Sequence, residues 1–113
     1  MKSFSFSIPG RPRPKGRPRV SARGFVYTDS TTREYEKHVG NSYKEAEGPL
    51  FEGSVCVVVK LTTKGAEVTI SDIDEQSSLR ADVDNYVKSI LDGLNGIAFK
   101  DDKQVLILKA YKN

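Results

Sequence analysis

Four of the chain's five prolines lie within ten residues of one another, at Pro9, Pro12, Pro14 and Pro18. Proline fixes φ and has no backbone N–H, so this stretch is excluded from helices and β-ladders and favours an extended path. The surrounding residues 9–24 read PGRPRPKGRPRVSARG and include no acidic residue. We call residues 9–24 the basic arm and expect the folded core to form from the residues outside it.

The basic arm carries six of the chain's 18 Lys and Arg residues. The formal net charge is +3, so the rest of the chain sums to −3 without these six charges. Guanidinium groups spaced along an extended backbone suit the regular phosphates of a nucleic acid. We therefore predict that the arm binds DNA; a solvated linker or a ligand of an SH3-type domain are the alternatives. The predicted DNA-binding residues are Arg11, Arg13, Lys15, Arg17, Arg19 and Arg23.

Composition and cysteine content narrow the class of protein further. A chain of 113 residues with 37% hydrophobic and 29% charged residues matches a single globular domain. The longest apolar run, Val55–Val59, is far shorter than the about 20 residues of a membrane-spanning helix, and no signal peptide is recognisable. Cys56 is the only cysteine and His38 the only histidine, too few for a disulfide or a zinc finger. We expect a cytoplasmic domain without a membrane partner.

The hydrophobic periodicity predicts alternating strands and helices along the chain. Apolar residues alternate with serines in the first segment, whereas helical spacing of apolar residues marks two later segments. The unbroken apolar run in the third predicted strand indicates burial on both of its faces. This β–(β)–α–β–α–β order predicts an α+β fold, a small mixed sheet with two helices packed on it. The predicted strands of this order are residues 2–8, 25–27, 54–61 and 104–111, and the predicted helices are residues 30–47 and 84–96. Residues 68–70 are a candidate for one further short strand.

Acidic residues are concentrated around the second predicted helix. Asp82 and Asp84 are two residues apart in an extended approach to that helix, so their carboxylates can share one small volume. Lys88 is four residues after Asp84, which places both on one helix face; we expect this face to lie opposite the helix's apolar stripe. The pair Asp101-Asp102 opens the last predicted strand and can return to the helix start. We expect these carboxylates to converge.

Converging carboxylates repel one another, so folding gathers them only around a cation. Oxygen ligands without histidine or cysteine select Mg²⁺ or Mn²⁺, and such a site is completed by substrate phosphates. The combined pattern predicts a metal-dependent phosphodiesterase that acts on nucleic acid. Taken singly, each residue has a simpler interpretation: Asp82 or Asp84 as a helix cap, Asp101-Asp102 as a turn, and Lys88 as an ion-pair partner of Asp84.

The same residues carry a family resemblance over almost the whole chain. The sequence resembles the RusA-type Holliday junction resolvases, small endodeoxyribonucleases of bacteria and their phages. The order and spacing of the motifs match the family. The matching segments are the basic residues 9–19, the motif Asp82-x-Asp84-Asn85-x-x-Lys88, residues 91–95 (LDGLN) and the motif Asp101-Asp102-x-Gln104.

This resemblance implies a single endonuclease domain over residues 1–113 that uses Mg²⁺, with Mn²⁺ as a substitute. It implies Asp82, Asp84 and one residue of the pair Asp101-Asp102 as metal ligands, with the alignment favouring Asp102. It implies Lys88 as the catalytic lysine. The implied substrate is the four-way DNA junction of recombination and repair. A nuclease selective for other branched DNA and a non-catalytic nucleic-acid-binding module are the alternatives.

The implied reaction calls for two active sites. Resolution nicks two opposed strands related by the junction's own two-fold axis, and one 113-residue domain has room for one site. A homodimer with two-fold symmetry supplies the second. Its interface is predicted either at the Val55–Val59 strand or at the apolar residues of the first strand.

Overall fold

The computed structural model describes residues 2–16, 19–27 and 29–113. The chain divides into two compact units, Met1–Asp74 and Glu75–Asn113. Arg17, one of the predicted DNA-binding residues, lies outside the described residues, and so does the side chain of Arg19. The elements in chain order are β1 (Ser3–Pro9), β2 (Arg19–Val20), β3 (Val26–Tyr27), α1 (Ser30–Glu45), β4 (Val55–Thr62), β5 (Gly65–Asp72), α2 (Val83–Leu94) and the 3₁₀-helix η1 (Asp102–Gln104).

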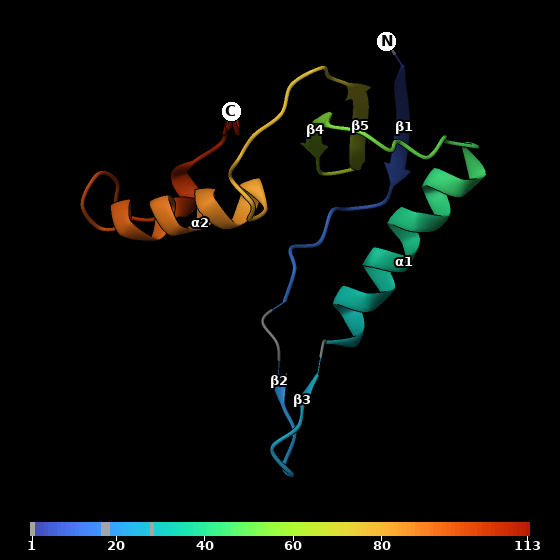
Figure 1. Ribbon diagram of the computed structural model, residues 1–113. Helices are drawn as coiled ribbons and strands as arrows, with labels where there is room; N and C mark the ends of the chain where they lie inside the picture. Colours follow the sequence, from blue (N-terminus) through green and yellow to red (C-terminus); the bar gives the residue numbers. More distant parts are fainter. Residues whose placement is uncertain (1, 17–18, 28) are drawn as a thin grey trace. The chain divides into compact units, whose positions relative to one another are not determined.

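The N-terminal unit is built on an antiparallel sheet with the strand order β1-β5-β4 (Figure 1). The alternation of Phe and Ser in β1 places its aromatic and aliphatic side chains on one face and its hydroxyls on the other. Ser5 pairs with Thr69 of β5, and their hydroxyl oxygens lie 2.7 Å apart. One face of the sheet is therefore apolar and the other is polar.

Helix α1 packs against the apolar face at β1. The buried apolar core consists of Ile8, Ala66 and Val68, and the half-buried Tyr35 and Val39 of α1 pack against it. The two phenylalanines of β1 meet the ring of Tyr43 edge-on, at centroid distances of 5.5 Å for Phe4 and 5.0 Å for Phe6. Such edge-to-face pairs add to the stabilisation from buried area. The predicted strand and helix in this part of the chain are confirmed within about two residues.

The prediction that the Val-rich strand is buried on both faces is wrong. β4 forms the edge of the sheet, and the side chains of Val57 and Val59 are 53% and 50% exposed. α1 packs against β1, two strands away, so the apolar face of β4 is left open within the described residues. β5 is longer than the predicted residues 68–70, because it pairs with β1 along seven residues and with β4 along eight.

The end of the basic arm takes part in a β-hairpin. Arg19 and Val20 form β2 and pair with Tyr27 and Val26 of β3 in a short antiparallel hairpin. The prediction that the arm takes no part in a β-ladder is therefore wrong at these two residues. The prolines exclude pairing only where they occur, and Val20 already lies beyond Pro18.

The C-terminal unit contains α2 and η1. Asp82 is the N-cap of α2, so the predicted helix start near Asp84 is confirmed within one residue. The predicted last strand at residues 104–111 is wrong: residues 105–113 form no helix or strand. A strand requires a neighbour for its backbone N–H and C=O groups, and this unit offers the segment no strand to pair with. The α+β fold class is confirmed, and one domain over residues 1–113 stays a prediction.

Within the part of the chain that the structure describes, neither α1 nor α2 combines the length and apolarity needed to cross a membrane.

The β4–β5 turn provides a test of the sheet. A Cβ atom at Gly65 would lie 2.6 Å from the backbone carbonyl oxygen of Ile8, so alanine at this position must push β1 away from β5. We expect Gly65→Ala to lower the free energy of unfolding by about 1–3 kcal/mol. At Gly53 no heavy atom of the described residues lies within 4 Å of the added Cβ, and Gly53→Ala is the matched control, expected to change stability by less than about 0.5 kcal/mol. Urea unfolding of both variants measures the difference, and equal losses would contradict this description of the β1–β5 contact.

Candidate active site and DNA-binding arm

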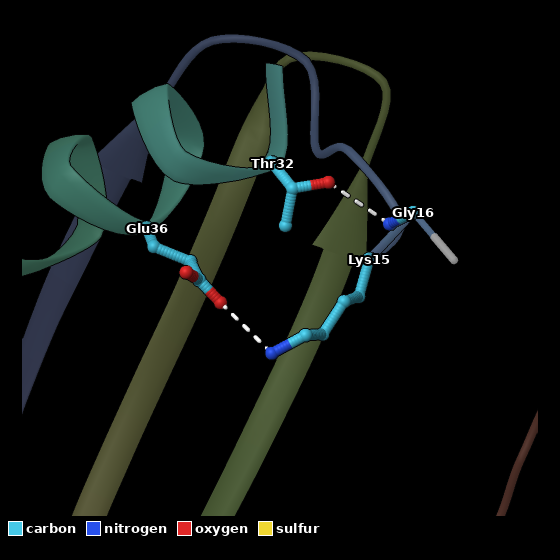
Figure 2. Close-up of polar contacts among 4 residues, drawn as sticks. All are labelled: Lys15, Gly16, Thr32 and Glu36. Carbon is cyan, nitrogen blue, oxygen red and sulfur yellow. Dashed lines mark hydrogen bonds and ion pairs between the residues drawn. The ribbon is translucent and has the colours of Figure 1, made fainter. Parts of the chain in front are cut away.

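The first half of the basic arm is tethered to α1. The backbone N–H of Gly16 donates to the hydroxyl of Thr32 at 2.9 Å, and the ammonium of Lys15 pairs with the carboxylate of Glu36 at 3.2 Å (Figure 2). Thr32 and Glu36 are four residues apart, so they lie on the same face of the helix. Further along α1, the ring nitrogen Nε2 of His38 lies 2.6 Å from the backbone carbonyl oxygen of Pro9. The arm therefore leaves the sheet along α1.

The two contacts of the tether differ in strength. Thr32 is only 5% exposed, so losing its hydroxyl leaves the part-buried N–H of Gly16 without its protein partner. The Lys15–Glu36 pair is exposed to solvent on both sides, and such pairs contribute about 0–1 kcal/mol. Lys15 therefore remains available to a stronger anion, as the prediction of a DNA contact requires.

The other described cations of the arm face solvent. Arg11, Arg13 and Arg23 are exposed. Arg13 lies between two prolines, and together these residues line part of an apolar pocket of about 660 Å³ on the open face of the sheet. Pro12 and Pro14 therefore border the apolar face, and Arg11 and Arg13 are exposed to solvent.

The C-terminal unit contains a cleft of about 310 Å³ beside α2. It brings together residues from three places in the sequence: the face of α2, the start of η1 and the C-terminal segment. Among them are three carboxylates and one ammonium group. The lining residues are Val83, Asp84, Val87, Lys88, Leu91, Asp92, Asp102, Leu108 and Ala110.

The prediction that the charged face of α2 lies opposite its apolar face is wrong. Asp84, Val87, Lys88 and Leu91 all line the cleft, as expected for residues spaced i, i+3, i+4 and i+7 on one face of a helix. The side chains of Val87 and Leu91 are half-buried, and those of Asp84 and Lys88 are exposed at the rim. The acidic groups therefore border an apolar floor.

The cleft includes one acidic residue that the sequence analysis does not assign to the site. Asp92 is four residues beyond Lys88 and continues the same face of α2. Its spacing from Asp84 and Lys88 is the signal that identifies it.

Asp82 lies at the N-terminus of α2 and does not line this cleft. Its backbone carbonyl accepts from the N–H groups of Asn85 and Tyr86, whereas its side chain makes no capping hydrogen bond. The simpler interpretation, that the side chain of Asp82 caps α2, is therefore wrong for this structure. Its carboxylate is exposed at the positive end of the helix dipole.

Asp101 and Asp102 have different surroundings. The carboxylate of Asp101 accepts the backbone N–H of Lys103 at 2.9 Å, and the side chain of Gln104 accepts the N–H of Asp101, which closes a capping box around η1. The N–H of Lys103 is the main cause that lowers the pKa of the Asp101 carboxyl group. Asp102 follows this cap and lines the cleft. Asp101 therefore acts in turn structure, and Asp102 faces the cleft.

The donor atoms of the cleft suit a hard metal ion. They are carboxylate oxygens, with no histidine or cysteine among the lining residues, which fits a hard cation such as Mg²⁺. Among the described residues, no three His, Cys, Asp or Glu side chains lie close enough together to hold a metal ion as a group. Asp84 and Asp102 line the same cleft, and no ion pair joins Asp84 to Lys88 within the described residues of this unit.

Comparisons with known proteins bear on the same residues. Residues 9–113 match the family model described as Endodeoxyribonuclease RusA. A curated relative, described as Uncharacterized protein YqaN of Bacillus subtilis (strain 168), is 31% identical over 126 aligned residues, which cover 99% of this chain and 88% of the relative. No solved structure gives a significant match to the chain.

The family match covers the basic arm, α2 with its acidic cleft and η1. A cleft lined by carboxylates and one lysine offers the groups that metal-dependent phosphodiester chemistry uses, and a basic segment offers cations for phosphates. The chain belongs to the RusA endodeoxyribonuclease family.

The tether of the arm can be tested by local proteolysis. Trypsin does not cleave before proline, so Arg11, Arg13 and Arg17 are protected by sequence and Lys15–Gly16 is the first cleavable bond of the arm. We expect Thr32→Val to lower stability by about 1–2 kcal/mol and to speed cleavage after Lys15, because it removes the acceptor for the N–H of Gly16. Glu36→Gln removes only the exposed ion pair and is the control, with an expected loss below about 0.5 kcal/mol. Equal cleavage rates in both variants would show that Thr32 does not hold the arm.

Proposed function

We propose that this protein is a Mg²⁺-dependent endodeoxyribonuclease that resolves four-way DNA junctions by paired nicks, in recombination and repair. The observation that supports it most is the shared cleft of Asp84, Lys88 and Asp102 in a chain of the RusA endodeoxyribonuclease family. A phosphodiester enzyme of this kind combines carboxylates for a metal ion with a cation for the phosphate. The proposal includes a cytoplasmic location, where the chromosome is accessible.

Asp84 and Asp102 are the residues proposed to bind the metal ion directly. Mg²⁺ is usually held by one or two carboxylates, and waters and substrate phosphates fill its other positions. A cleft without a three-carboxylate group is compatible with such a partly hydrated ion. Asp82, whose side chain does not cap α2, is proposed as a further ligand, and Asp101 as the residue that positions Asp102. When bound, Mg²⁺ or Mn²⁺ polarises the phosphoryl oxygen and lowers the pKa of a coordinated water.

Lys88 is proposed to act on the scissile phosphate. Its ammonium group is at the same cleft as the two carboxylates, and it is not paired with Asp84 among the described residues. A compact ammonium group placed there stabilises the negative charge that develops on the phosphoryl oxygens. Asp92 at the next turn of α2 would raise the local affinity for cations.

The basic arm is proposed to bind the DNA backbone outside the cleft. Arg11, Arg13 and Arg23 are exposed, and the Lys15–Glu36 pair is weak enough to open. Each phosphate contact releases counterions, so binding should weaken steeply with salt.

The homodimer is also part of the proposal. β4 is an edge strand with a long row of exposed apolar side chains, and such edges tend to pair with another chain. The apolar residues of β1 contact α1 instead. Of the two interfaces predicted from sequence, β4 is therefore the one we propose.

Cleavage of defined DNA substrates tests the function. Wild-type protein is incubated with a four-way junction, a fork and a linear duplex of the same sequence, each with and without Mg²⁺. We expect paired nicks in the junction, only with metal. Preferred cutting of forks would favour the other branched-DNA nuclease, and binding without strand scission at any Mg²⁺ or Mn²⁺ concentration would favour the non-catalytic module.

The two adjacent aspartates provide a matched comparison. Asp102→Asn removes a proposed ligand, and we expect junction cleavage to fall at least about a hundredfold with binding retained. Asp101→Asn is the control, because asparagine can still accept the N–H of Lys103 and cap η1, so cleavage should change by less than about threefold. Single-turnover cleavage at saturating protein measures both. Equal losses in the two variants would contradict the different roles assigned to them.

Lys88 separates a structural role from a catalytic one. If it faces the scissile phosphate, Lys88→Ala should lower the single-turnover rate by about 10²–10³. Lys88→Arg should recover little of that rate, since a planar guanidinium places its charge differently. Thermal unfolding of the variants is the control, because the side chain is exposed and its removal should leave the midpoint nearly unchanged. A folded Lys88→Ala protein that cuts at close to the wild-type rate would remove Lys88 from the mechanism.

A further inference from the structure

The hairpin formed by β2 and β3 exposes large apolar side chains at the end of the basic arm. Phe25 and Val26 are each 69% exposed, and Val20 and Tyr27 are exposed as well. None of them belongs to the buried core of the N-terminal unit. Figure 1 shows the hairpin as a two-stranded ribbon at the N-terminal end of α1. A cluster of exposed aromatic and aliphatic residues of this kind marks a binding surface.

The backbone of the hairpin fixes the position of Phe25. The N–H of Ser21 donates to the carbonyl of Phe25 at 2.7 Å, and the hydroxyl of Ser21 accepts the N–H of Phe25 at 3.1 Å. Gly24 has φ +85°, a conformation that side-chain-bearing residues rarely adopt, and its N–H donates to Ser21 at 2.9 Å. These contacts close the turn, so the ring of Phe25 is presented on an ordered loop beside Arg23.

The two sides of the hairpin carry different residues. Val20 and Val26 are directly paired, so their side chains share one side. Phe25 and Tyr27 are two residues apart on the returning extended segment, so both project to the opposite side. One side is therefore aromatic and the other aliphatic. This gives a comparison between neighbours of equal exposure, Phe25 and Val26.

The charge around the aromatic side identifies its partner class. Residues 9–28 contain six cations and no acidic residue. An exposed aromatic surface in a strongly basic segment is complementary to a polymer that carries both phosphates and flat bases. Base–aromatic stacking is independent of sequence and needs a base face that is not already covered by its neighbours. A continuous duplex offers no such face, whereas a branch point does.

We propose that Phe25, with Tyr27 beside it, stacks on an exposed base at the branch point of the DNA and so makes the arm selective for branched over linear DNA. This inference rests on the proposed junction-resolving function. In this binding mode the arginines of the arm bind the phosphates of any DNA. The aromatic side of the hairpin recognises the branch point, where base stacking is interrupted.

The test measures binding to a four-way junction and to a linear duplex, without divalent metal so that no cleavage occurs. Phe25→Ala should weaken junction binding by about 5- to 150-fold, the range found for loss of one base–aromatic stack, and leave duplex binding nearly unchanged. Phe25→Tyr keeps an aromatic ring and should bind junctions within about twofold of wild type. Val26→Ala is the matched control on the other side of the hairpin and should behave like wild type. A junction with 2-aminopurine at the branch point should change its fluorescence with wild type and Phe25→Tyr only.

The remaining outcomes overturn the inference. Phe25→Ala that binds junctions like Val26→Ala, or that loses junction and duplex binding equally, would exclude selective stacking. A change in sedimentation mass of Phe25→Ala without a change in DNA binding would assign the hairpin to contact with a second copy of the chain. If wild type neither prefers nor cuts junctions, the proposed function fails, and this inference fails with it. If wild type cuts junctions and Phe25→Ala cuts them equally well at limiting concentration, only the inference fails.

Discussion

The contact between α1 and β1 is the constraint on which the N-terminal unit depends. A core of three buried side chains, Ile8, Ala66 and Val68, is completed by Tyr35 and Val39 from the helix. The same helix then receives the basic arm through Thr32 and Glu36. Because α1 contacts both the sheet and the arm, it sets the position of the arm's first residues. Pro9, at the end of β1, already contacts His38 of this helix. The hairpin at the end of the arm is bounded in the sequence by this tether on one side and by the start of α1 on the other.

In the C-terminal unit a small capping motif has a comparable importance. The capping box of η1 uses the carboxylate of Asp101 and the amide of Gln104, and the turn it closes sets Asp102 at the cleft beside α2. On the other side, Lys112 donates to the backbone carbonyl of Ala81 and keeps the C-terminal segment along the helix, where Leu108 completes the apolar floor. The bonds that position η1 and the C-terminal segment thus join side chains to backbone groups, and no ion pair is found among the described residues of this unit. Carboxylates held in this way remain available to a cation.

Much of this arrangement follows from local sequence, and the rest follows from contacts that local sequence does not contain. The two helices and β1 were predictable because hydrophobic periodicity acts within a few residues, and the shared face of Asp84 and Lys88 follows from their spacing. The strand expected at residues 104–111 has a suitable apolar pattern but no partner in its unit, and the burial expected for β4 depends on which strand α1 covers. The distinct roles of Asp101 and Asp102 depend on Gln104 folding back, and the aromatic hairpin depends on the Ser21–Phe25 turn. The sequence alone does not distinguish Asp101 from Asp102, because their different surroundings arise only when the turn at η1 forms.

The central claim is that the cleft of the C-terminal unit binds a divalent metal ion through Asp84 and Asp102. Mn²⁺ is paramagnetic and broadens the NMR signals of nearby nuclei, so titrating it into the isotope-labelled full-length protein locates the ion directly. The amide signals of Asp84, Lys88 and Asp102 should be among the first to broaden as Mn²⁺ is added, and the effect should disappear in Asp84→Asn. Broadening that spares the cleft, or that persists unchanged in Asp84→Asn, would contradict the claim.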